Sequence, residues 1–363
     1  MGKRTNTAQW IEKQGRWRIN VQKDGERKSF YSSKPGRTGQ REANTKADAW
    51  LDEGITADKR VSELWGGYAE GQKAKSTTTY KKAVYIGDVW VKPRIGHKKM
   101  SSVTEQDFQN IISAAAMSGK RDNAKGLSKK SLENIRAEIR AFLKYCRKSK
   151  VTTMFAEDLT IPAGAKRSQK AVIQPEHIKV LFSSDLSTFR GKTIIDPYIN
   201  AYRFAVLTGL RPGELMALTW EDIKDDRVFV RRSINIFSEE TQGKNKNAVR
   251  AFVMTPEAAT VIEDQRKISL TGQTVFEIST QHNFRDCWYR YCLYNQIPKI
   301  TPYEMRHTFV SMAKTLPEGL VKQLVGHSKD MDTFGTYGHL IGDDSNIAAA
   351  ALSSAFNHIL GKE

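Results

Sequence analysis

The second half of the chain contains side chains that suit attack on a phosphodiester bond. Two arginines, a lysine and a histidine accompany one tyrosine; in chain order they are Arg211, Lys244, Arg306, His327 and Tyr337. Such a reaction builds negative charge on the non-bridging oxygens, so donors and positive charge must be fixed in advance. A guanidinium donates two parallel hydrogen bonds to one phosphate and keeps its charge. A phenol becomes a nucleophile when its proton is accepted and the phosphate is neutralised. The set predicts phosphodiester chemistry through Tyr337 as the nucleophile.

These residues lie in short sequence words. The words are Thr-Gly-Leu-Arg-Pro-Gly-Glu-Leu at 208–215, Thr-Pro-Tyr-Glu-Met-Arg-His-Thr at 301–308, Leu-Val-Gly-His-Ser at 324–328 and Thr-Tyr-Gly-His at 336–339. Their order, and the spacing of ten between His327 and Tyr337, resemble the tyrosine recombinases, the lambda-type integrase family of temperate phages and integrative elements. The resemblance is strong over 174–340 and covers the first 170 residues by organisation only.

The resemblance implies a role for each residue. Tyr337 would attack the phosphate, form a 3′-phosphotyrosyl link and free a 5′ hydroxyl. Arg211 and Arg306 would clamp the phosphate, with Glu214 as a supporting acid. His327 would donate to the phosphate or help to deprotonate the nucleophile, and His307 and His339 are read as supporting residues.

Two positions depart from a simple match. The family lysine, which protonates the leaving 5′ oxygen, corresponds to Lys244, and Lys246 two residues later is a close competitor. Tyr303 stands where the family most often has a histidine. A phenol can donate to a phosphate oxygen, but it does not exchange protons near pH 7 as imidazole does.

The sequence predicts neither a metal nor a cofactor. It has no acidic cluster of the nuclease kind, and its three cysteines lack metal-ligand spacing. They are interpreted as reduced, mostly buried thiols of a cytoplasmic protein. The family resemblance implies a bacterial host and association with the nucleoid. No signal peptide and no apolar run of membrane-spanning length is found.

Positive charge is concentrated before residue 171. The formal net charge is +18. Residues 60–170 hold 23 lysines and arginines against 10 aspartates and glutamates, residues 1–57 hold 12 against 7, and residues 171–363 are balanced at 22 against 22. A clamp on the phosphate backbone, separate from the catalytic part, explains this distribution. A basic surface that serves only solubility is the alternative.

Short alternating runs at residues 8–33 predict a small sheet. Asp24-Gly25 separates two of the runs and is a strong hairpin signal. A helix is expected near 40–52. This pattern is similar to the family's N-terminal module, which binds arm-type DNA sites.

The segment 61–154 is predicted to be helical. Within 131–146, apolar residues recur at helical spacing, and basic residues occupy the opposite face: Arg136, Arg140, Lys144 and Arg147. These four either contact phosphates or are solvated. The segment corresponds to the family's core-binding domain, and 159–170 is interpreted as a linker.

Beyond residue 172 the pattern becomes mixed. A helix is expected from Pro197 to Gly209, followed by strands at 227–237 and 249–254. Thr301 is expected to cap a helix with Glu304 closing a capping box. The stretch 346–360 is expected to form a terminal helix, packed either on its own domain or on a neighbouring protomer.

The predicted fold class is multidomain α+β. It comprises an arm-binding module of three strands and a helix (1–57), a helical core-binding domain (58–158), a linker (159–171) and a mainly α catalytic domain with a small antiparallel sheet (172–363). The predicted function is site-specific DNA integration on double-stranded attachment sites by a homotetramer, with a DNA-bending protein and an excision directionality factor as further partners. A relaxing topoisomerase of type IB and a catalytically silent DNA-binding protein are the alternatives.

Overall fold

The computed structural model describes residues 5–23, 26–52, 59–118, 126–167, 171–241, 249–269, 272–326 and 344–362. The chain divides into two compact units, residues 1–168 and residues 169–363. Each unit is described by itself.

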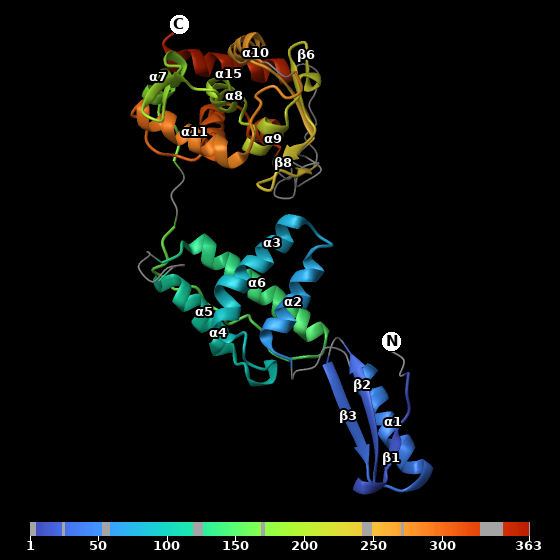
Figure 1. The fold of residues 1–363 in the computed structure, drawn as a ribbon. Helices are drawn as coiled ribbons and strands as arrows, with labels where there is room; N and C mark the ends of the chain where they lie inside the picture. Colours follow the sequence, from blue (N-terminus) through green and yellow to red (C-terminus); the bar gives the residue numbers. More distant parts are fainter. Residues whose placement is uncertain are drawn as a thin grey trace. The chain divides into compact units, whose positions relative to one another are not determined.

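The first unit begins with a three-stranded antiparallel sheet covered by one helix (Figure 1). The strands are β1 (Gln9–Ile11), β2 (Arg16–Lys23) and β3 (Glu26–Ser32), and the helix is α1 (Gly36–Asp52). Ile19 and Val21 alternate along β2 and are buried in the core together with Trp50 of α1. Lys23 pairs with Glu26 across the hairpin. The predicted turn residues, Asp24 and Gly25, lie outside the described part.

A second core in this unit is helical. Its helices are α2 (Val61–Gln72), α3 (Thr77–Ile86), α4 (Lys92–Ile95), α5 (Glu105–Ser118) and α6 (Lys129–Lys148), with a π-helical turn at Gly87–Val91. Ser128 caps α6 by accepting from the Ser131 amide. All six apolar residues predicted on the inner face of α6 are buried: Leu132, Ile135, Ile139, Phe142, Leu143 and Cys146. The helical prediction for this segment is therefore confirmed.

The basic face of α6 is used partly within the protein. Arg140 donates to the carbonyl oxygens of Ala156 and Glu157, both at 2.8 Å. Arg147 donates to Met154 at 2.8 Å. These guanidinium groups hold the segment that follows α6, whereas Lys144 is exposed. The predicted alternatives were phosphate contact and solvation. The structure shows a third arrangement for Arg140 and Arg147, whose guanidinium groups bind backbone carbonyls of the same unit.

The second unit combines helices with small antiparallel sheets. Its elements are α7 (Pro175–Ser183), β4 (Leu186–Phe189), β5 (Lys192–Ile195), α8 (Ile199–Thr208), α9 (Pro212–Ala217), β6 (Ile223–Lys224), β7 (Arg227–Val230), β8 (Ser233–Ile234), β9 (Glu240–Thr241), β10 (Arg250–Val253), α10 (Pro256–Ile268), α11 (Gln281–Tyr294), α12 (Tyr303–Met312), α13 (Glu318–Val325) and α15 (Asp344–Leu360). The predicted α+β fold class is confirmed.

Helix α8 lies inside this unit, between α10, α11 and α12. Of its ten residues only Arg203 is not buried. A helix that is apolar on all sides is stable because neighbours cover every face. It ends at Gly209, which adopts a positive φ of 64° as its C-cap. The predicted end of this helix is confirmed.

The main sheet has the order β10-β7-β6. Strand β7 pairs with β10, whereas β8 pairs with β9 in a separate two-stranded sheet. Residues 242–248 join β9 to β10 and lie outside the described part.

The terminal helix α15 packs on its own unit. Phe356 is buried, and its ring centroid lies 4.8 Å from that of Phe182 on α7. Ser353 and Asn357 donate to the Glu257 carboxylate of α10 at 2.7 and 2.9 Å. Of the two predicted packing partners, the structure shows the helix's own domain.

Candidate active site

Arg211 is held at the start of α9. Its φ of −69° and ψ of 148° make it the N-cap, directly before Pro212 at the first helical position. The Glu214 carboxylate accepts the Arg211 amide at 3.0 Å and its Nη1 at 2.7 Å. Nη2 donates to the carbonyl oxygen of Gly326 at 3.1 Å. The side chain is 28% exposed, so a phosphate can still approach it.

Glu214 is a buried anion between cations. Burial by itself would raise the pKa of this carboxyl. The hydrogen bonds and charges of Arg250 and Arg211 outweigh that effect and hold the pKa below its ordinary value. Glu214 is therefore ionised at neutral pH. The predicted supporting acid has a defined physical role, because its charge fixes the guanidinium of Arg211.

Gly213 lets a strand approach this helix. A Cβ atom there would lie 2.5 Å from the carbonyl oxygen of Ile234 and 2.5 Å from Oγ of Ser233. Strand β8 therefore packs directly against the backbone of α9. The glycine of the Arg-Pro-Gly-Glu word has a steric reason that the sequence did not reveal.

Arg306 lies on α12 and is almost completely buried. Nη1 donates to the carbonyl oxygen of Gly209 at 2.9 Å, and Nη2 donates to that of Val325 at 2.5 Å. Burial lowers the pKa of Arg306 to about 10, and the positive charge of Arg211 acts in the same direction. The guanidinium is still charged at neutral pH. Its environment holds a cation in place before any phosphate arrives.

The two predicted phosphate clamps meet at one place. Arg306 binds the carbonyl of Val325, and Arg211 binds the carbonyl of the next residue, Gly326. These carbonyls belong to the end of α13, where Gly326 has a positive φ of 63°. Arg211 and Arg306 are 95 positions apart in the chain, and both bind the C-terminal end of α13. The last of the bound residues, Gly326, directly precedes His327.

Tyr303 lies at the edge of this site. It precedes Arg306 by three residues on α12, which places both on one side of the helix. The side chain is 43% exposed, and its ring meets the His307 ring edge to face at 5.4 Å.

Residues of the motif at 301–308 also bind α12 to the first residues of the second unit. The Glu304 carboxylate accepts from the amides of Thr301 and Ala171. The N-cap of α12 is Pro302, without a side-chain cap bond, so the prediction that Thr301 caps this helix is wrong. The helix begins at Tyr303. The hydroxyl of Thr308 accepts from the amide of Ile173 at 2.9 Å.

Several predicted site residues lie outside the described part of the chain. They are Lys244, Lys246, His327, Tyr337 and His339. Their neighbours are described: Thr241 ends β9 before the lysines, and Gly326 follows the end of α13 directly before the histidine. In the described ranges, no group of three or more His, Cys, Asp or Glu side chains is placed to hold a metal ion.

Arg250 is a residue that the sequence interpretation missed. It begins β10, its side chain is 7% exposed, and it binds Glu214 with N–O distances of 3.2 and 2.9 Å. A signal was present. Arg250, Phe252 and Met254 alternate along a strand-like run, and the last two are apolar. An arginine on the inner face of a strand requires a buried anion as its partner.

Comparison with known proteins gives a consistent result. The phage integrase family matches residues 190–342. Prophage integrase IntR of Escherichia coli (strain K12) is 28% identical over 153 residues, which are 41% of this chain and 34% of that protein. The chain therefore matches about a third of that relative. An integrase of Streptomyces ambofaciens is 23% identical over 367 residues, with 88% of each protein covered.

A solved structure has the same fold. It is the Tn1549 transposon integrase in complex with transposon right end DNA, with a TM-score of 0.61 and 19% identity over 81% of this chain and 99% of that one. No helix among the described residues combines the length and apolar character that crossing a membrane requires. Over residues 190–342, which include the motifs around Arg211 and Arg306, this chain is similar to the phage integrase family, and it shares the fold of the Tn1549 integrase.

Proposed function

We propose that the protein is a site-specific DNA recombinase of the integrase type, which cuts and rejoins DNA through a tyrosine. The observation that carries the proposal is the meeting of Arg211 and Arg306 at adjacent carbonyls of α13. Two fixed guanidinium groups at one point, one of them partly exposed, suit a phosphate that gains charge during reaction. Their shared position directly precedes His327.

The proposed reaction is a transesterification at Tyr337. The phenol oxygen attacks phosphorus, a P–O bond to tyrosine forms, and the bond to the 5′ oxygen breaks. The phenol proton passes to His327 or to water, and Lys244 or Lys246 gives a proton to the leaving 5′ oxygen. One phosphoester bond replaces another, so the reverse step joins a new 5′ hydroxyl without ATP. Arg211, Arg306 and Tyr303 bind the phosphate oxygens, and His327 assists.

The proposed partners follow from the charge and from the family. The excess of positive charge before residue 171 suits a clamp on double-stranded attachment sites. We assign residues 1–57 to arm sites, 58–158 to core sites, 159–171 to the linker and 172–363 to catalysis; the boundary between the two compact units falls within this linker. A homotetramer on DNA, a bending protein and a directionality factor complete the proposal, which places the protein at the nucleoid in the bacterial cytoplasm.

A catalytically silent DNA-binding protein is not favoured. Burying Arg306 and Glu214 is costly unless they are paired, and here each has charged or carbonyl partners. A chain without catalysis would have no need to direct three guanidinium groups to one helix end. Tyr303 is the one departure that points the other way.

The test is formation of a covalent protein–DNA adduct. The full chain is incubated with a duplex from the end of its parent element, nicked so that the cleaved strand diffuses away. The wild type is expected to give a protease-sensitive adduct, and Tyr337→Phe none. Tyr294→Phe, which alters a half-exposed tyrosine on α11, is the matched control and should react as the wild type does.

Each other outcome would be informative. An adduct that survives Tyr337→Phe moves the nucleophile elsewhere, with Tyr303 next to be tested. Specific DNA binding without any adduct supports the silent DNA-binding protein.

A further inference from the structure

Arg250 connects three segments that carry predicted catalytic residues. It begins β10, directly after the residues that include Lys244 and Lys246. Its Nη atoms donate to both carboxylate oxygens of Glu214, and its Nε donates to the carbonyl oxygen of Leu324 at 2.7 Å. Both carboxylate contacts are charge-assisted and bidentate, the strongest form of this interaction.

Three guanidinium groups bind the end of α13. Arg250 binds the carbonyl of Leu324, Arg306 that of Val325, and Arg211 that of Gly326. The last carbonyls of a helix lack partners within the helix and carry partial negative charge. Cations there hold the last turn of α13 in place. The next residue along the chain is His327.

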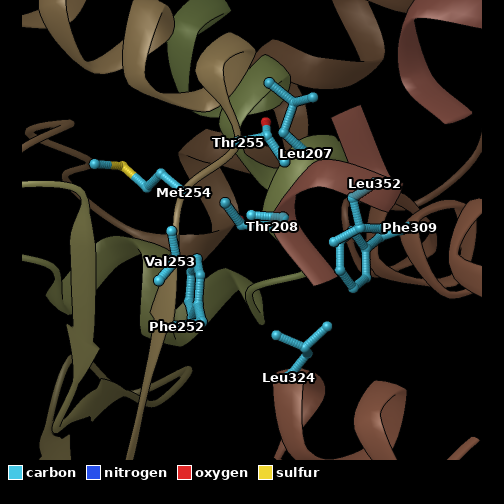
Figure 2. Close-up of a pocket in the computed structure, with 10 residues that line it drawn as sticks. Leu207, Thr208, Phe252, Val253, Met254, Thr255, Phe309, Leu324 and Leu352 are labelled. Carbon is cyan, nitrogen blue, oxygen red and sulfur yellow. The ribbon is translucent and has the colours of Figure 1, made fainter. Parts of the chain in front are cut away.

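Leu324 packs against the core of the unit and lines a small cavity. Figure 2 shows Leu324 on α13 facing Phe309 and Leu352 across this cavity. The cavity has a volume of about 10 Å³, close to the least that a single water occupies. The bond from Arg250 to the Leu324 backbone holds the end of α13 together with this side-chain packing.

We propose that Arg250 is a positioning residue of the recombination site. It fixes Glu214, and through Glu214 the guanidinium of Arg211. It also fixes the end of α13 before His327 and the start of β10 after the predicted lysines. The proposal rests on the proposed function and adds a residue outside the motif words. Arg250 touches neither DNA nor the reacting atoms in this assignment.

A positioning role and a purely stabilising role of Arg250 predict different pH dependences of the cleavage rate. The charged groups that face Glu214 from the described elements are Arg211 of α9, Arg250 of β10 and Arg306 of α12. Removing Arg250 takes away the main effect that opposes burial, so the pKa of Glu214 rises. Arg211 then loses its anion at a higher pH than in the wild type. The acid side of the pH–rate profile must move upward.

The experiment measures adduct formation in a single turnover on the nicked duplex, with protein in excess, from pH 5 to pH 9. The variants are Arg250→Met and Arg250→Lys, with Arg227→Met as the matched control. Arg227 lies on the adjacent strand β7 with a half-exposed side chain. DNA affinity and folded fraction are measured on the same samples.

We expect Arg250→Met to bind DNA within about threefold of the wild type and to cleave about 100-fold more slowly, the loss that a misplacement of about 1 Å can cause. The acid limb of its pH–rate profile should lie at higher pH than that of the wild type. Arg250→Lys keeps the charge without the bidentate geometry, so its cleavage rate should lie between those of the wild type and Arg250→Met. Arg227→Met should cleave as the wild type does.

Other results overturn the proposal. A rate within threefold of the wild type for folded Arg250→Met or Arg250→Lys does so. So does a loss that follows the folded fraction or the DNA affinity, with an unmoved pH profile. If Arg250→Met does not fold, Arg250→Lys decides by the same criteria. A wild type that forms no adduct refutes the proposed function itself, and so is distinguished from failure of Arg250 alone.

Discussion

Arg306 donates a hydrogen bond to the backbone carbonyl of Gly209 at 2.9 Å. Because Gly209 is the C-cap of α8, this bond connects the motif at residues 301–308 to the motif at residues 208–215. Gly209 has a φ of 64°, and a Cβ atom there would lie 2.4 Å from Cδ1 of Phe309. The glycine is thus required both for its backbone angle and for the ring that packs on it.

Gly209→Ala should therefore destabilise the catalytic unit. The positive φ costs about 1–2 kcal/mol in an alanine, and displacing the ring of Phe309 adds about 1–3 kcal/mol. The matched control is Gly191→Ala, where φ is 77° and no atom lies within 4 Å of the added Cβ. Thermal unfolding of both variants measures the difference. Equal losses would refute the steric role of Phe309.

Glu214→Gln should remove a pH-dependent contribution to stability. Breaking one partner of a buried ion pair costs about 3–5 kcal/mol. The pKa of Glu214 is lowered in the folded state, so the stabilisation is complete above the ordinary value of 4.5 and is lost as pH falls through the lower folded value. Urea unfolding of wild type and variant should show a constant gap from pH 8 to pH 5. The gap should narrow at more acidic pH, and a constant gap there would contradict this assignment.

Tyr303 can be tested by two substitutions at one position. Tyr303→Phe removes the hydroxyl and should slow adduct formation about 10-fold, the effect of losing one hydrogen bond to a charged group. Tyr303→His keeps a donor and should retain cleavage while adding a dependence on pH between 5 and 8. Single-turnover rates over that range are the measurement. An unchanged rate for Tyr303→Phe would remove this residue from the phosphate site.

Arg140 and Lys144 should separate folding from DNA binding on α6. Arg140→Ala loses two bonds to backbone carbonyls and should lower the stability of the first unit by about 1–2 kcal/mol. Lys144→Ala should leave stability unchanged and reduce the slope of log affinity against log salt by about one. Thermal unfolding and DNA binding at several salt concentrations decide. Equal stability of the two variants would show that the Arg140 bonds do not stabilise this unit.

Phe356 tests whether α15 is anchored on its own unit. Phe356→Ala removes a buried ring packed against Phe182 and should cost about 3–5 kcal/mol. Ile347→Ala, at a residue of the same helix that is 60% exposed, should change stability by less than about 0.5 kcal/mol. Unfolding of the protein free of DNA is the measurement. A small effect of Phe356→Ala would favour packing of α15 on another protomer.

Local patterns in the sequence predicted several of the elements and the resemblance to the family. The apolar spacing of α6, the glycine that ends α8 and the alternation of β2 each follow from contacts a few residues apart. The motifs around Arg211 and Arg306 predicted the chemistry that we propose, because their residue types are what a phosphate requires.

Only the tertiary structure decided which partners these groups have. Arg250 is far in sequence from both Glu214 and Leu324, and Arg306 is 97 residues from Gly209. Partners so distant leave no periodic trace in the sequence, because they are chosen by how helices and strands pack. The sequence determined that the arginines are present, and the packing of α8, α9, β10 and α12 decided that they meet at the end of α13. The physical reason is that buried charges are stable only where the fold supplies oppositely charged or carbonyl groups.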